Sequence, residues 1–76
     1  MKHADIVIKL EERYAQLTPS ERQVADVFRS DPDFFKESTL FDIAIRAGVS
    51  EPSIGRFCKS LDLRGLRDLR DAIASD

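Results

Sequence analysis

The fold of this chain is decided by the stretch TLFDIAIRAGVSEPSIGRFCKSL, residues 39–61. Within it, segments 40–47 and 51–60 carry apolar residues at helical spacing, and each follows a Ser or Thr of the kind favoured as a helix N-cap. Gly48 lies between them and most readily takes the left-handed conformation that ends a helix. Two short helices joined by such a turn are typical of a helix-turn-helix, and a plain helical hairpin is the alternative.

The side chains of this stretch suit two helices in close contact. Ala44 is small where the first helix must approach the second, and Val49 fills the corner between them. Ile54 and Phe57 occupy the inner face of the second helix. A side chain at Gly48 would have to adopt a positive φ, at a cost of roughly 1 kcal/mol.

Outside this stretch, the apolar spacing predicts helices over residues 5–16, 19–30 and 65–74, and a short helical turn over 33–37. No segment alternates with the period of two that a strand requires. We therefore expect an all-α, homeodomain-like bundle of five helices that forms one domain over residues 1–76, with the helix-turn-helix at its centre.

The start of the second helix is marked by a complete signal. Thr18 is an N-cap residue, Pro19 stands at the first helical position, and Glu21 can complete a capping box. Pro32 ends the helix, because the residue before a proline is pushed out of the helical region.

Charge is unevenly distributed along the chain. The 76 residues carry a net charge of −2 and a pI near 5.3, which argues against a polybasic nucleic-acid or membrane binder. The segment from Arg46 to Arg67, however, holds five basic and two acidic residues, a local charge of +3. The net charge of the whole chain therefore does not reveal this basic segment, which overlaps the helix-turn-helix.

A helix-turn-helix would present the outer face of helix 51–60 to the major groove of DNA. Ser53 and Gly55 are small enough to let the backbone approach base edges, Arg56 can reach a guanine or a phosphate, and Lys59 can hold a phosphate. The candidate DNA-binding residues are Thr39, Arg46, Ser50, Glu51, Pro52, Ser53, Gly55, Arg56, Lys59, Ser60, Arg64, Gly65 and Arg67. A solvated helix face is the alternative interpretation of Arg56 and Lys59 taken singly.

Two residues of this face need their own explanation. Glu51 repels phosphate, but it complements the helix dipole and can also accept a hydrogen bond from a cytosine amino group. Gly55 weakens a helix interior by about 1 kcal/mol relative to alanine. It indicates close approach of either DNA or a neighbouring helix.

Catalytic and cofactor functions find no support in the sequence. His3 stands alone, Cys58 faces inward without a nearby histidine, and no metal-spaced cluster or glycine-rich phosphate loop occurs. We expect no enzyme activity and no cofactor. The chain also lacks an apolar run of eighteen residues and a signal peptide, so we expect a cytoplasmic protein without membrane contact.

The first helix carries more apolar surface than one neighbour requires. Ile6 and Leu10 recur at helical spacing, and Ile8 lies off their stripe. We therefore expect Ile6, Ile8 and Leu10 to contribute to a homodimer interface.

Three runs of the sequence resemble a known family: residues 17–25 (LTPSERQVA), residues 38–44 (STLFDIA) and above all residues 49–59 (VSEPSIGRFCK). They are similar to the N-terminal DNA-binding domain of RpiR-type bacterial transcriptional regulators, and most similar to the branch that represses hexose catabolism. The resemblance covers nearly the whole chain.

The resemblance implies a helical domain without a developed wing that binds a palindromic operator in double-stranded DNA as a homodimer. It also implies a separate C-terminal sugar-isomerase-type domain, absent from this chain, through which a phosphorylated sugar acts as effector. It places Ser50, Ser53, Arg56 and Lys59 at the DNA, and Arg64 with Gly65 at a following backbone contact.

The chain departs from the family pattern at three positions. Gly55 stands where the family usually has a polar or β-branched residue. Asp62 stands where the family usually has a glycine after the helix 51–60, and Leu66 stands where an aromatic residue is common. Asp62 can adopt the left-handed conformation, so we expect the turn to be kept. A protein-interaction module whose basic face meets an acidic partner is the rival to DNA binding.

Overall fold

The computed structural model describes residues 2–75, which form six α-helices and one 3-10 turn and contain no strand. In chain order these are α1 (His3–Arg13), η1 (Tyr14–Gln16), α2 (Pro19–Ser30), α3 (Phe34–Glu37), α4 (Leu40–Ala47), α5 (Glu51–Ser60) and α6 (Leu66–Ala74). The all-α prediction is confirmed. The predicted count of five helices is one too low, because the helical turn expected over residues 33–37 forms α3.

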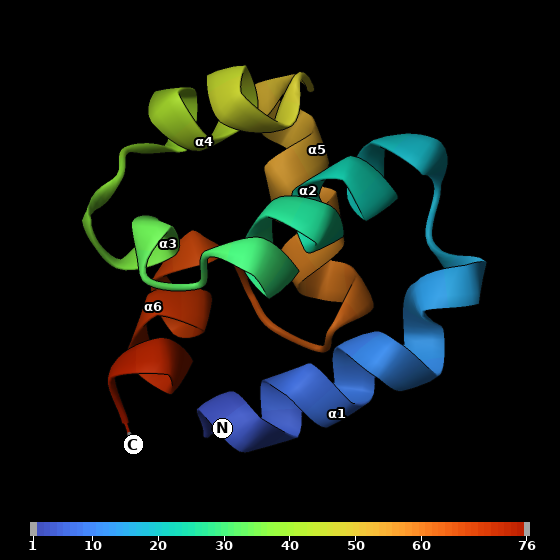
Figure 1. Cartoon of the computed structure of the whole chain (residues 1–76), viewed down its shortest axis with the longest axis vertical. Helices are drawn as coiled ribbons and strands as arrows, with labels where there is room; N and C mark the ends of the chain where they lie inside the picture. Colours follow the sequence, from blue (N-terminus) through green and yellow to red (C-terminus); the bar gives the residue numbers. More distant parts are fainter. Residues whose placement is uncertain (1, 76) are drawn as a thin grey trace.

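The helix α5 lies at the centre of the molecule. In Figure 1 it passes behind α2, with α4 on one side and α1 on the opposite side, and it also packs against α6. Phe57 and Ile54 of α5 are completely buried, and the rings of Phe28 and Phe35 meet edge to face at 5.4 Å in the same core. Packing on several sides thus determines which face of α5 remains outside.

The turn between α4 and α5 has the geometry that the sequence predicts. Gly48 lies in the left-handed region with φ of 71°. The Val49 amide donates to the carbonyl of Ala44 at 3.0 Å, and the Gly48 amide donates to that of Ile45 at 3.2 Å. These bonds satisfy carbonyls at the end of α4 and direct the chain into α5.

Helix starts follow the predicted caps at two of three positions. Thr18 accepts from the Glu21 amide at 3.2 Å, and Thr39 accepts from the Asp42 amide at 3.1 Å. Ser50 occupies the N-cap position of α5, but its hydroxyl makes no capping bond to the backbone. The capping role predicted for its side chain is therefore wrong.

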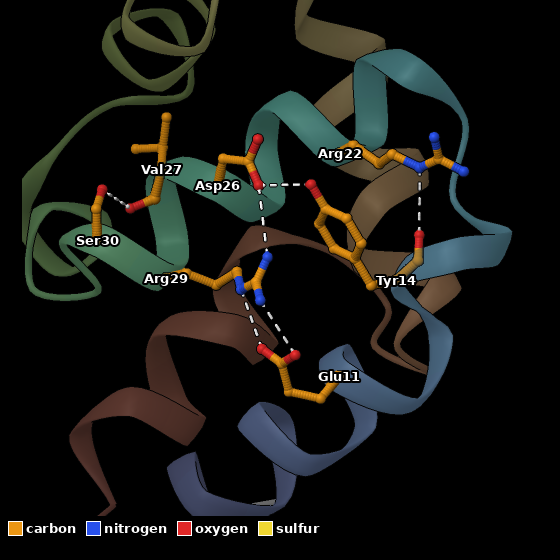
Figure 2. Close-up of polar contacts among 7 residues, drawn as sticks. All are labelled: Glu11, Tyr14, Arg22, Asp26, Val27, Arg29 and Ser30. Atoms are coloured by element: carbon orange, nitrogen blue, oxygen red, sulfur yellow. Dashed lines mark hydrogen bonds and ion pairs between the residues drawn. The ribbon is translucent and has the colours of Figure 1, made fainter.

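A polar cluster attaches α1 to α2. Figure 2 shows Arg29 of α2 paired with Glu11 of α1, with Nε and Oε1 3.0 Å apart. Tyr14 donates from its hydroxyl to Asp26 at 2.7 Å, and the Arg29 guanidinium lies 4.7 Å from the centre of the Tyr14 ring. The first helix begins at His3, before the predicted range 5–16, and it ends at Arg13 because the next three residues form η1.

The two glycines of the helix-turn-helix should respond in opposite ways to alanine. At Gly48 an added Cβ has room, with the nearest side-chain atom 3.8 Å away, but the positive φ should destabilise Gly48→Ala by about 1 kcal/mol. At Gly55 an added Cβ meets nothing within 4 Å, so Gly55→Ala should stabilise the domain by about 0.5–1 kcal/mol. Urea denaturation of both variants tests this, and equal effects of the same sign would contradict it.

Candidate nucleic-acid interface

The outer face of α5 carries two cations that are free for a ligand. Glu51, Pro52, Arg56 and Lys59 are exposed, and Gly55 between them is half-buried. Arg56 and Lys59 form no ion pair with any residue between positions 2 and 75. These two side chains can therefore meet phosphates or base edges without first breaking a contact within the domain.

Two candidate residues of α5 face the protein instead. Ser53 is only 3% exposed, and its hydroxyl lies 3.0 Å from that of Ser50, so its predicted place on the outer face is wrong. Ser60 donates from its hydroxyl to Glu21 at 3.3 Å, on the side of α5 that meets α2. Both side chains therefore lie at the boundary between the exposed face of α5 and the face that packs against neighbouring helices.

The candidates on α4 lie at its two ends. Thr39 is exposed as the N-cap, and its side chain accepts from the Asp42 amide. Arg46, near the C-terminal end, pairs with Asp31 at 3.1 Å and stacks over the Phe34 ring at 4.4 Å. Arg46 is thus already engaged in joining α4 to the α2–α3 connection, unlike the cations of α5.

Two of the remaining candidates, Arg64 and Gly65, lie between α5 and α6, and Arg67 is the second residue of α6. Arg64 and Arg67 are exposed, and Gly65 is half-buried immediately before α6. Asp62 adopts the left-handed conformation with φ of 64°, which confirms that the turn tolerates aspartate in place of glycine. Arg64 and Arg67, which follow this turn, are accessible at the surface.

An α1 residue outside the predicted set holds the end of α5. Arg13 donates to the Ser60 carbonyl at 2.7 Å and to the Asp62 carboxylate at 3.0 Å, and Lys9 reaches the same carboxylate at 3.0 Å. These bonds hold the pKa of Asp62 at about 2. The spacing of Lys9 and Arg13 puts both on one face of α1, which the sequence alone shows. Their partners lie about fifty residues away in the sequence, so the contact itself could not be predicted.

The structure corrects the predicted dimer contacts. Ile6 is completely buried and Leu10 is 1% exposed, because both pack into the domain's own core. Ile8 is 59% exposed, and its neighbour Val7 is 41% exposed. The free apolar surface of α1 is therefore centred on Val7 and Ile8.

Cys58 is buried, and desolvation raises the pKa of its thiol to about 12. Among residues 2–75 no group of three or more His, Cys, Asp or Glu side chains is placed to hold a metal ion. None of the helices described there is long and apolar enough to cross a membrane.

The left-handed turn at Gly48, the packed pair α4 and α5, and the free cations on the outer face of α5 define a helix-turn-helix domain. The chain belongs to the rpiR family of helix-turn-helix domains, whose family model matches residues 4–76. This membership places the chain among the DNA-binding domains of transcriptional regulators.

Similar proteins include two regulators and one bifunctional protein. The chain is 40% identical over 62 residues to the HTH-type transcriptional regulator HexR of Escherichia coli, and 41% identical over 61 residues to YbbH of Bacillus subtilis. It is 42% identical over 59 residues to the bifunctional protein glk of Paraburkholderia xenovorans. The matches cover 78–82% of this chain, but only 22% of each regulator and 9% of the bifunctional protein.

A solved structure has the same fold. The crystal structure of the N-terminal domain of the B. subtilis regulator YbbH superimposes with a TM-score of 0.84 at 35% sequence identity. The match covers 93% of this chain and 87% of that one.

Removal of the Asp62 carboxylate should lower stability in a pH-dependent way. The pKa of Asp62 is depressed from 3.8 to about 2, so its contribution is present above pH 4 and is lost as the pH falls toward 2. Asp62→Asn keeps a residue that tolerates the left-handed conformation and should melt at a lower temperature than the wild type at pH 7.

The difference in melting temperature should narrow between pH 4 and pH 2, as measured by circular dichroism. A difference that is the same at both ends of this range would show that the ion pairs with Arg13 and Lys9 are not its source.

Proposed function

We propose that the domain recognises a specific operator by placing the outer face of α5 in the major groove of double-stranded DNA. The observation that carries this proposal is the pair of exposed, unpaired cations, Arg56 and Lys59, on the second helix of the helix-turn-helix. Arg56 reads a base edge, and Lys59 holds a phosphate. Arg64 and Arg67 extend the phosphate contacts beyond the end of α5.

The cations of α1 and α2 also favour α5 as the helix that contacts DNA. Lys9, Arg13 and Arg29 are paired with carboxylates of the domain itself. These ion pairs would have to break before the three cations could bind phosphate. Arg46 stabilises the connection before α4 and contributes to the DNA contact only through the field around it.

We propose that the complete regulator controls genes of sugar or central carbon metabolism, which the similarity to HexR supports. A phosphorylated sugar acts as effector through a separate domain, in keeping with the much greater length of the similar regulators. The domain itself binds rather than catalyses, which its membership of a helix-turn-helix family supports. The regulator acts in the cytoplasm, as a repressor or as an activator of transcription.

Fluorescence anisotropy tests the DNA-binding proposal with three probes: a duplex enriched from a random pool by the domain, a scrambled duplex and an acidic polymer. The enriched duplex should bind most tightly, with an affinity that falls with salt at a log-log slope of about −0.9 per phosphate contacted. Equal binding to all three probes would instead support a protein-interaction module for acidic partners.

Arg56→Ala should weaken binding to the enriched duplex by about 1–3 kcal/mol and relax the preference for one base position. Lys59→Ala is the matched control from the same helix face. It should weaken all duplexes alike and reduce the salt slope by about 1. An unchanged preference among duplex variants for Arg56→Ala would remove the base-reading role from Arg56.

We also propose that two copies bind a palindromic operator as a homodimer and that they meet through Val7 and Ile8 of α1. Both side chains are substantially exposed, and they line a shallow surface with His3 and Ala4. Burial of such an apolar strip between two copies removes it from water and thereby favours the dimer.

Ile8→Lys should shift the domain toward monomers in sedimentation velocity and reduce cooperative binding to a palindromic duplex, because it places a charge in an apolar contact. Ile45→Lys is the matched control, since Ile45 of α4 is 66% exposed and the same charge is added. If both variants sediment like the wild type, α1 does not form the dimer contact.

A further inference from the structure

An apolar hollow of about 460 Å³ borders the outer face of α5. It lies where the first turns of three helices meet, and it is lined by Leu40, Glu51, Pro52, Ile54, Gly55 and Leu66. Glu51 is the one charged residue among those that line the hollow. Because Pro52 and Gly55 also belong to the outer face of α5, the hollow is continuous with the proposed DNA contact.

Gly55 is not explained by packing within the domain. Its backbone is not in the left-handed region, and a Cβ built on it meets nothing within 4 Å. A glycine within a helix weakens that helix, so the fold alone would favour alanine here. The effect of Gly55 on its surroundings is to keep the hollow open beside the helix.

The charge of Glu51 indicates which part of a DNA duplex approaches this end of α5. A carboxylate repels phosphate, whereas it accepts a hydrogen bond from the exocyclic amino group of a base. The exposed Pro52 beside it offers carbon surface and no backbone N–H donor. This end of the helix therefore suits base edges better than the sugar-phosphate backbone.

We propose that the hollow receives the 5-methyl group of a thymine, so that Pro52 and Gly55 are specificity-determining residues for a T·A pair. The 5-methyl of thymine is the apolar group that base pairs present in the major groove. Burial against Pro52, Leu66 and the backbone of Gly55 removes the methyl group from water. This inference rests on the proposed entry of α5 into the major groove.

The test uses the duplex enriched from a random pool and replaces its thymines one at a time by deoxyuridine, which lacks only the 5-methyl group. Wild-type domain should bind about fourfold more weakly at one thymine of each half-site, the loss that follows from exposing one buried methyl group. Uniform affinity across all uridine-substituted duplexes would overturn the inference. Failure to enrich any duplex would overturn the proposed function itself.

The variant Gly55→Leu is designed to fill the hollow with protein carbon, and circular dichroism should show the same helix content as the wild type. It should lose the penalty for uridine at the sensitive position. The control Lys59→Gln, on the same helix face, should bind every duplex more weakly and keep that penalty. A uridine penalty that persists unchanged in Gly55→Leu would place the methyl contact elsewhere and overturn the inference.

Discussion

The burial of one face of α5 against α2, α4 and α6 is the constraint on which the rest of the domain depends. Ile54, Phe57 and Leu61 are completely buried, and a ten-residue helix in isolation would be marginal in water. Once this face is buried, the opposite face of α5 must point outward. The left-handed Gly48 sets the direction in which the helix leaves α4. The position of the exposed face of α5 therefore depends on packing on the opposite side of the same helix.

Electrostatic contacts within the domain engage some of its cations and leave Arg56 without an ion pair among the described residues. Arg13 and Lys9 neutralise Asp62, and Arg46 pairs with Asp31, whereas Arg56 remains free on α5. A net charge of −2 is consequently compatible with a DNA-binding surface, because many of the acidic residues precede Arg46 in the chain. The hydrogen bond from Arg13 to the Ser60 carbonyl also fixes the position of α1 relative to α5.

Local signals in the sequence were sufficient for the helices and the central turn. The capping box at Thr18, the stop before Pro32 and the positive φ of Gly48 each depend on residues within four positions of one another. The tolerance of Asp62 for the left-handed conformation is local in the same sense. These features, and the basic segment around α5, could be predicted because backbone preference and charge are properties of neighbouring residues.

Long-range packing decided the rest. Helical periodicity placed Ser53 on the outer face of its helix, but contact with neighbouring helices buries it. In the same way Ile6 and Leu10, which the sequence assigned to a dimer interface, pack into the core, and Ile8 remains exposed. The open hollow beside Gly55 exists only because three helix starts converge there. The sequence by itself thus determines which segments are helical, where the central turn lies and where the charge is concentrated, because these depend on neighbouring residues. Which side chains of each helix are buried is decided by contacts with residues distant in the chain.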